Sequence, residues 1–273
     1  MIRFHDIVKD DLAILGLPLD HNSSYMTGPA LAPSRMREAL HCGSANLTSE
    51  SGFDLGMEPR WKDIGDLSFT NVENSLDEIE QVASDVLSRG AKLLSIGGDH
   101  SVSGPLIRAH TKTYPGLNIL HFDAHSDLYD EMDGNRNSHA CPFARAMETG
   151  QVKRLVQVGI RTLNKHQKEQ AERFGVEIIA MKDWSTEVLF DFDGPLYLSI
   201  DLDVLDPAFA PGVSHHEPGG MSVRDLLNSL YKLNADLIGA DIVELNPHRD
   251  LVGMTAMVAA KLTKEVSAKL LGK

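Results

Sequence analysis

The sequence predicts an α/β protein with three layers, in which a mostly parallel sheet lies between two layers of helices. Short apolar segments typical of buried strands alternate with amphipathic segments typical of helices along most of the 273 residues. Polar motifs recur at the carboxyl ends of the strand-like segments, where open α/β sheets place their sites. No linker-like stretch or internal repeat divides the chain, so we expect one domain over residues 1–273.

The first half of the chain is expected to contribute four strands and three helices. The clearest helix has Leu76, Ile79 and Val86 on one side and Gly90 as its stop. The segment 42–60 has little periodicity and indicates a long loop. The expected strands are 12–17, 61–67, 91–96 and 119–122, and the expected helices are 35–40, 72–89 and 103–113.

The second half of the chain continues the alternation of strands and helices. A parallel sheet covered on both faces follows from this order, because each strand must return to the same edge through a crossover helix. The expected strands are 154–160, 176–180, 195–203 and 236–243, and the expected helices are 164–174, 223–233 and 253–271.

Composition excludes several classes of protein. The net charge of −13 argues against a nucleic-acid surface, which needs clustered Lys and Arg. Cys42 and Cys141 are far apart and lack a metal-type spacing, which favours a reducing compartment. The segment Met1–Asp6 lacks the basic and apolar regions of a signal peptide, and no apolar run is long enough to cross a membrane. We therefore expect a cytoplasmic protein without a nucleic-acid or membrane partner.

A polar motif follows the strand-like run at 119–122. Asp123, His125 and Asp127 are each two residues from the next, so an extended chain would direct all three side chains to one face. Carboxylate, imidazole and carboxylate on one face suit a divalent metal ion better than a core. A polar turn after a strand is the alternative interpretation of this stretch taken alone.

Other strand ends carry the same residue types, and this favours a metal site. Four carboxylates crowded together would repel strongly unless about two divalent cations balanced them. Oxygen-rich ligands with two imidazoles and no thiolate favour Mn²⁺, with other divalent ions possible. Two such ions could hold a water of lowered pKa between them. The candidate ligands are His100, Asp123, His125, Asp127, Asp201 and Asp203.

Three blocks of the sequence resemble the signature blocks of the ureohydrolase family. That family includes arginase, agmatinase, guanidinobutyrase and formimidoylglutamase. The blocks are Gly97–Ser101, Asp123–Asp127 and Ser199–Pro207. All six metal positions are filled by the expected residue types in order. The stretch 206–220 and the segment from Gly253 are most similar to the plant-type arginases.

The resemblance implies an arginase-like fold and a guanidino hydrolase that releases urea and an amine at two Mn²⁺ per subunit. One ion would be held by His100, Asp123, Asp127 and Asp203, and the other by Asp123, His125, Asp201 and Asp203, so that Asp123 and Asp203 are shared. Asp127 would assist the nucleophile, Glu244 would pair the guanidinium with both carboxylate oxygens, and His139 would deliver a proton to the leaving amine. Substrate contacts would come from Asn135, Asn137, His139 and Glu244. A homo-oligomer, trimer or hexamer, is also implied.

The identity of the guanidino substrate is less well specified. Animal-type arginases use Asn and Ser in the loop after the Asp123–Asp127 block to bind the α-carboxylate of the substrate, but this chain has Tyr129 and Asn135 there. Those enzymes bind the α-amino group through an acidic segment, and the corresponding segment here, which begins at Thr162, has no acidic residue. Arginine is the leading substrate on the resemblance to plant-type enzymes. Agmatine, guanidinobutyrate, guanidine and formimidoylglutamate are alternatives, and a non-catalytic metal-binding relative is a remote one.

Several polar residues are given more ordinary roles. Asp99 is expected to orient His100 rather than bind metal. A dinuclear phosphoesterase would need basic or glycine-rich phosphate cradles, and the metal-binding blocks contain none. Histidines expected to be structural or solvent-facing are His110, His121, His166 and His248, and the loop residues whose roles stay open are His215, His216 and Glu217.

Overall fold

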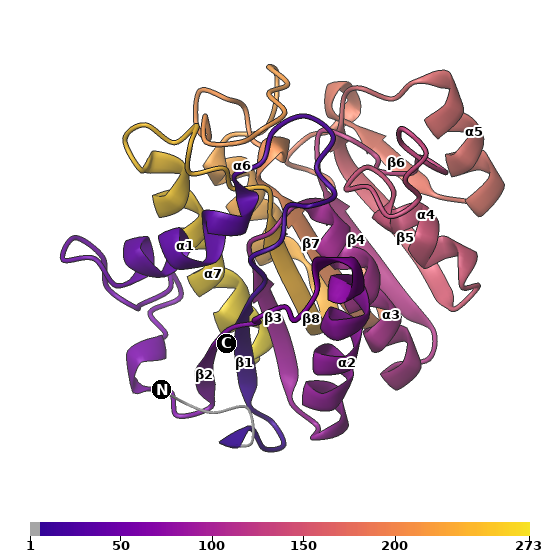
Figure 1. The fold of residues 1–273 in the computed structure, drawn as a ribbon. Helices are drawn as coiled ribbons and strands as arrows, with labels where there is room; N and C mark the ends of the chain where they lie inside the picture. Colours follow the sequence, from indigo (N-terminus) through magenta and orange to yellow (C-terminus); the bar gives the residue numbers. More distant parts are fainter. Residues whose placement is uncertain (1–5) are drawn as a thin grey trace.

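The computed structural model describes residues 6–273, and its eight strands form one sheet in which every pair is parallel (Figure 1). The strand order is β2-β1-β3-β8-β7-β4-β5-β6. The segment Met1–Asp6 was predicted not to be a signal peptide, and residues 1–5 of this segment lie outside the described residues. The strands are β1 (Leu12–Gly16), β2 (Trp61–Asp66), β3 (Lys92–Ile96), β4 (Leu117–Phe122), β5 (Val152–Ile160), β6 (Glu177–Ala180), β7 (Asp191–Asp201) and β8 (Asn234–Val243).

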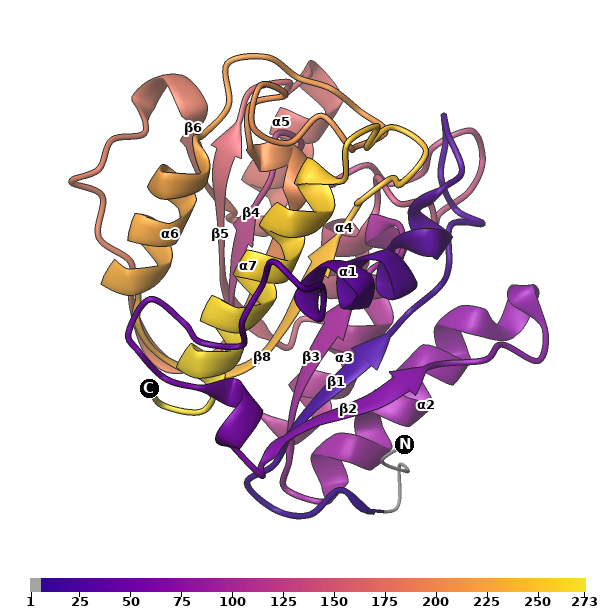
Figure 2. The same cartoon turned by 90° about the vertical axis from the view of Figure 1, so that its left-hand side faces the viewer.

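Helices cover both faces of the sheet, which confirms the predicted three layers. On one face lie α1, α6 and α7 (Figure 2). Their side chains Met36, Leu227 and Leu262 belong to one apolar cluster with the sheet. On the other face, α2, α3, α4 and α5 pack in a second cluster that includes Ile79 and Phe143. The helices are α1 (Ala32–Leu40), α2 (Ser75–Ser88), α3 (Ser103–Thr113), α4 (Pro142–Glu148), α5 (Lys165–Phe174), α6 (Val223–Lys232) and α7 (Met254–Leu270).

The predicted order of elements matches the structure, with differences at the ends and one omission. The seven-residue helix α4 was not predicted, because Pro142–Glu148 is too short for helical periodicity to stand out. Strand β7 begins at Asp191, upstream of the predicted start at Pro195. The segment 42–60 is the expected long loop, with a short 3₁₀ turn at Leu55–Met57. In residues 6–273 no helix is both long and apolar enough to span a bilayer.

Strands β3, β8, β7 and β4 are consecutive neighbours in the centre of the sheet. Because all are parallel, their carboxyl ends meet at one edge. The chain leaves β3 through Gly97 and Gly98, both with positive φ (78° and 86°), which allows a turn that other residues rarely adopt. The four loops that follow these strands carry the polar motifs found in the sequence.

Candidate metal centre and active site

The first cluster of ligand-type side chains surrounds His100, which begins a 3₁₀ turn after β3. Its Nδ1 atom lies 3.2 Å from Asp123 Oδ2, 3.0 Å from Asp127 Oδ2 and 3.2 Å from Asp201 Oδ2. All four side chains are almost fully buried. Three carboxylate oxygens converging on one imidazole nitrogen in a buried place form a ligand set suited to a divalent cation.

The proton on His100 is placed by a chain of hydrogen bonds that the sequence did not reveal. The Ser199 hydroxyl donates to Asp241 Oδ1 at 2.6 Å, and Tyr197 donates to Asp241 Oδ2 at 2.6 Å. Ser199 has a single proton, so it must accept from His100 Nε2, 3.0 Å away. In the neutral imidazole that could bind a cation, the proton therefore sits on Nε2, and the lone pair of Nδ1, which has no hydrogen-bond partner among residues 6–273, faces the three acids.

The second cluster surrounds His125. Its Nδ1 atom lies 3.0 Å from Asp203 Oδ2 and 3.4 Å from Asp123 Oδ1. Asp123 thus presents one oxygen to each histidine. This arrangement is what a carboxylate shared between two cations requires.

The structure corrects the predicted division of the acids. Asp203 was expected near His100, but Asp201 is the acid that lies beside His100, and Asp203 lies beside His125. The reason is local: β7 ends at Asp201, and a 3₁₀ turn over Leu202–Val204 redirects the chain. Alternation of side chains along a strand therefore does not extend to Asp203.

The route by which Asp123, His125 and Asp127 converge also differs from the prediction. Strand β4 ends at Phe122, so the three residues belong to the following loop and not to an extended strand. Asp127 has a φ of 49°, in the left-handed region that non-glycine residues rarely adopt. A looped backbone, rather than strand alternation, directs both carboxylates toward His100.

Electrostatics favour cations at these clusters. Burial and repulsion from Asp203 and Asp123 raise the pKa of Asp201 well above its ordinary value. Burial also raises the pKa of Asp203, to about 6, although His125 opposes the shift. Burial opposes the charged form of His100, but in the cation-free site the nearby carboxylates of Asp123, Asp127 and Asp201 outweigh it and raise its pKa well above the ordinary value. Crowded acids whose charged forms are disfavoured gain most from nearby dications, so the donor set fits a metal pair.

His121 was expected to be structural, and it is buried against this centre. Gln157 Nε2 donates to the Ser126 carbonyl at 2.6 Å and to His121 Nδ1 at 3.0 Å. Because Nδ1 accepts, the proton of His121 is on Nε2, which donates to Asp123 Oδ2 at 2.8 Å. His121 therefore orients a candidate ligand, and this bond leaves it no free lone pair for a cation.

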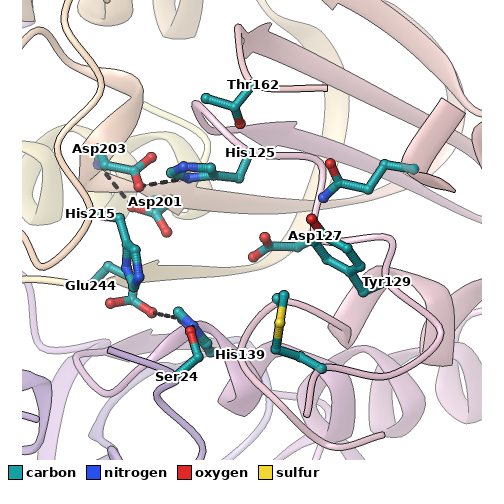
Figure 3. Close-up of a pocket in the computed structure, with 13 residues that line it drawn as sticks. Ser24, His125, Asp127, Tyr129, His139, Thr162, Asp201, Asp203, His215 and Glu244 are labelled. Carbon is teal, nitrogen blue, oxygen red and sulfur yellow. Dashed lines mark hydrogen bonds and ion pairs between the residues drawn. The ribbon is translucent and has the colours of Figure 1, made fainter. Parts of the chain in front are cut away.

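Glu244 and His139 form a buried pair beside the clusters (Figure 3). Glu244 Oε1 accepts from the backbone N–H of His100 at 2.9 Å and from His139 Nδ1 at 3.0 Å. His139 Nε2 lies 2.9 Å from Ser24 Oγ. Burial lowers the pKa of His139, but Glu244 outweighs this and raises it to about 9. Glu244 thus holds His139 in its charged form in the cation-free site.

A cavity of about 230 Å³ opens beside both clusters and the Glu244–His139 pair. The imidazole of His215 lies at its wall, with ring centroids 5.0 Å from His139 and 6.0 Å from His125. Asn135 and Asn137, predicted substrate contacts, do not line this cavity. Asn135 instead donates to Asn22 at 3.1 Å. The lining residues are Ser24, His125, Asp127, Tyr129, Met132, His139, Ala140, Thr162, Gln167, Asp201, Asp203, His215 and Glu244.

An all-parallel α/β sheet with two carboxylate–imidazole clusters beside a cavity at its central strand ends is an arrangement suited to a metal-dependent hydrolase. The model of the arginase family matches residues 10–268. The chain belongs to the arginase family, and it is accordingly a manganese-dependent ureohydrolase that cleaves a guanidino C–N bond to release urea. The predicted resemblance is confirmed.

Individual relatives agree with this family assignment. "Arginase 1, mitochondrial" of Arabidopsis thaliana is 47% identical, covering 99% of this chain and 84% of the relative. An agmatinase of Bacillus subtilis (strain 168) is 36% identical, covering 94% of this chain and 90% of the relative. The structure of an arginase from Medicago truncatula superimposes with a TM-score of 0.88 at 42% identity, covering 95% of this chain and 87% of that one.

The expected cytoplasmic location is contradicted by the comparisons. The similar arginases of Arabidopsis thaliana are named mitochondrial or chloroplastic/mitochondrial, and those of Oryza sativa are named mitochondrial. The prediction rested on few cysteines and on composition. Those features do not separate the cytoplasm from the interior of an organelle.

Proposed function

We propose that this enzyme hydrolyses arginine to urea and ornithine with two Mn²⁺ ions bound per chain. The observation that carries the proposal is the 47% identity to an Arabidopsis thaliana arginase over 99% of this chain. The two histidine-centred clusters that share Asp123 support the number of ions. When bound, such an ion pair would polarise a water molecule and supply a nucleophile near neutral pH.

We assign His100, Asp123, Asp127 and Asp201 to one ion, and His125, Asp123 and Asp203 to the other. Asp201 is repelled by both Asp203 and Asp123, which supports a place between the two ions and a second shared carboxylate. This assignment replaces the predicted sharing of Asp203. It follows the distances around the two histidines.

Glu244 would hold the guanidinium of the substrate. Its Oε1 already accepts two hydrogen bonds, whereas Oε2 has no partner among residues 6–273. One of the two oxygens that were predicted to pair the guanidinium is therefore already bonded to His100 and His139. Oε2 is the free acceptor, and a charge-assisted bond from the guanidinium to it would fix the carbon of the substrate beside the metal ligands.

His139 would protonate the leaving amine. Its Nδ1–H is committed to Glu244, so the transferable proton is on Nε2, beside Ser24. Dications at the adjacent clusters would lower the pKa of His139 from about 9 toward neutrality, where an imidazole donates protons most effectively. Asp127, a candidate ligand at the cavity wall, would accept a hydrogen bond from the attacking water.

The test is a urea assay on the metal-loaded protein with a panel of arginine, agmatine, guanidinobutyrate and guanidine, together with metal analysis. We expect the highest kcat/KM for arginine and about two ions per chain. A higher kcat/KM for another compound would overturn the substrate. Full activity with one ion or none would overturn the metal pair.

Agmatine is the second candidate. Agmatinases of Bacillus anthracis and Bacillus subtilis are 35% and 36% identical to this chain. In addition, no Lys or Arg among residues 6–273 lines the cavity, so the carboxylate of arginine has no cationic partner there. A preference for agmatine in the same panel would select this alternative.

Two further proposals concern the whole chain. The single sheet supports one domain over residues 1–273. A homo-oligomer, trimer or hexamer, is supported by the exposed apolar side chains of Leu251 (93%) and Val252 (81%), which a partner subunit could cover. Light scattering of the purified protein would measure its mass, and a monomer would exclude the oligomer.

A further inference from the structure

The cavity has a second side that takes no part in the chemistry assigned above. Tyr129 lies across the pocket from Glu244 and His215, and Thr162 lies above it (Figure 3). Met132 and Gln167 also line the cavity. These four side chains are neutral, so none of them offers the charged oxygen that a hard metal ion prefers. A substrate whose guanidinium is held at Glu244 would extend its other end toward this side.

Gln167 is an almost fully buried donor without an acceptor. It is 3% exposed and lies in the first turn of α5. Its Oε1 accepts from the backbone N–H of Asn164 at 3.4 Å, while Asn164 Oδ1 accepts from the Gln167 backbone at 2.9 Å. This capping box fixes the orientation of the amide. The Nε2 group is left with no hydrogen-bond partner among the described residues, in a side chain that lines the cavity.

Tyr129 provides a second free proton. Asn164 Oδ1 is used by the cap, so its Nδ2 is the donor to Tyr129 Oη at 2.5 Å. Because the phenolic oxygen accepts this bond, its own proton has no acceptor among residues 6–273. The ring stacks on His166, with centroids 5.6 Å apart and planes 18° apart, which holds the hydroxyl in place.

The surroundings of these donors favour an anion. Helix α5 has ten residues and no acidic residue in its first turn, so its amino end adds a positive potential near Gln167. An ammonium group has only hydrogen-bond donors of its own, so it could not accept a hydrogen bond from Gln167 or Tyr129. A carboxylate, which only accepts hydrogen bonds, satisfies both Gln167 and Tyr129.

We propose that Gln167 Nε2 and Tyr129 Oη form a carboxylate subsite that selects a guanidino amino acid over its decarboxylated amine. This inference rests on the proposed function and names the residues that would set its substrate preference. Arginine carries a carboxylate at the end distant from the guanidinium, whereas agmatine carries only an ammonium there. Neutral donors at this place would replace the cationic partner that the cavity lacks.

The test is Gln167→Glu, assayed with both substrates. Glutamate at this position keeps a carboxyl oxygen for the capping box and replaces the donor amide with a negative charge. We expect kcat/KM for arginine to fall by about 10- to 100-fold, mainly through KM, as for a lost hydrogen bond to a charged group. The kcat/KM for agmatine should stay unchanged or rise. Tyr129→Phe should lower kcat/KM for arginine and leave kcat/KM for agmatine unchanged, because the ring would still stack on His166.

The matched control is Gln170→Glu, the same chemical change one turn further along α5. Gln170 is also buried, at 6% exposed, but it does not line the cavity, and its Oε1 accepts from Arg173 at 3.1 Å, which would pair the new charge. Both substrates should react as in the wild type, and thermal melts should show that every variant folds. If Gln167→Glu changes kcat/KM equally for both substrates, or for neither, the proposed subsite is wrong while the proposed function still stands. Absence of arginine turnover in the wild type would overturn the proposed function as well.

Discussion

At the scale of single residues, Glu244 links the metal ligands to the acid–base group. Its backbone has a φ of 67°, a left-handed conformation that costs a non-glycine residue about 1–3 kcal/mol. The backbone N–H of Glu244 donates to Gly98 O at 3.0 Å, and the side chain accepts from His100 and His139. These contacts hold the strained backbone, and they aim the carboxylate at the cavity.

Replacing Glu244 by glutamine tests the binding of the guanidinium. Gln keeps an oxygen for His100 and His139 but presents an N–H₂ group where Oε2 was free. Loss of the charge-assisted bond should cost about 1.5–3 kcal/mol in kcat/KM, equally for every guanidino substrate. Steady-state kinetics on arginine and agmatine measure it, with the exposed Glu131→Gln as control. Loss confined to one substrate would mean that Glu244 contacts the substrate's tail instead.

The residues Asp127 and His139 should separate metal binding from proton transfer. Asp127→Ala removes an oxygen that lies 3.0 Å from His100 Nδ1, so the variant should lose an ion together with turnover. His139→Ala should retain both ions and lose about 10²–10⁴-fold in kcat, as expected for an acid–base group. Metal analysis beside kinetics distinguishes the two. Equal metal loss in both variants would place His139 among the ligands.

The candidate ligands could be predicted from sequence because they fall in short blocks, each at the end of a strand. The residues that orient them could not. Ser199 and Asp241 act on His100 across the sheet, and Gln157 acts on His121 from the next strand. Such contacts depend on strand order, which the sequence left open. An unexplained Asp241 inside an apolar strand was the one available signal, since an acid there needs buried donors.

At the scale of elements, the turn after β3 positions the site. Gly98 has a φ of 86°, and its carbonyl accepts from the Glu244 backbone. A Cβ atom at this position would lie 2.7 Å from the Leu17 carbonyl oxygen, which belongs to the chain after β1. The strand therefore packs against a neighbouring loop with no room for a side chain. Close packing here brings His100 and Glu244 together.

Gly98→Ala should therefore destabilise the protein and disturb the site. The positive φ alone costs alanine about 1–2 kcal/mol, and the contact with Leu17 adds to it. Gly116→Ala is the matched control, because its φ is 73° and a Cβ there meets nothing within 4 Å. Denaturant unfolding should show a larger loss for Gly98→Ala than for Gly116→Ala. Equal losses would show that the close approach to Leu17 is relaxed by movement.

The order and type of the long elements could be predicted, whereas loop geometry could not. In helix α2 and the core strands, the spacing of apolar residues in the sequence matches the side chains that are buried in the structure. The Asp123–Asp127 loop and the 3₁₀ turn at Leu202–Val204 do not follow strand alternation, so the predicted facing of their acids was wrong in detail. The same residues still converge, because the ends of adjacent parallel strands bring them together.

At the scale of the whole molecule, charge and stability are coupled through the metal centre. The chain has a net charge of −13, and the four acids among its candidate metal ligands are all buried. Without cations, the raised pKa of Asp203, about 6 against an ordinary 3.8, means that the folded state binds more protons than the unfolded state between these values. Stability of the apo protein from this group therefore falls as pH rises through that window.

Metal binding reverses this dependence, because its ligands must be deprotonated. We expect Mn²⁺ to raise Tm relative to EDTA-treated protein, and the gain to be larger at pH 7.5 than at pH 5.5. Thermal melts with and without Mn²⁺ at both pH values measure it. Asp201→Asn removes a buried carboxyl group whose charged form is disfavoured in the apo site, so its apo form should be more stable than wild-type apo protein at pH 7.5. Its gain from Mn²⁺ should be smaller, because a ligand is lost. A gain in Tm that is independent of pH, or undiminished in Asp201→Asn, would show that the acids of this centre do not carry the metal's effect on stability.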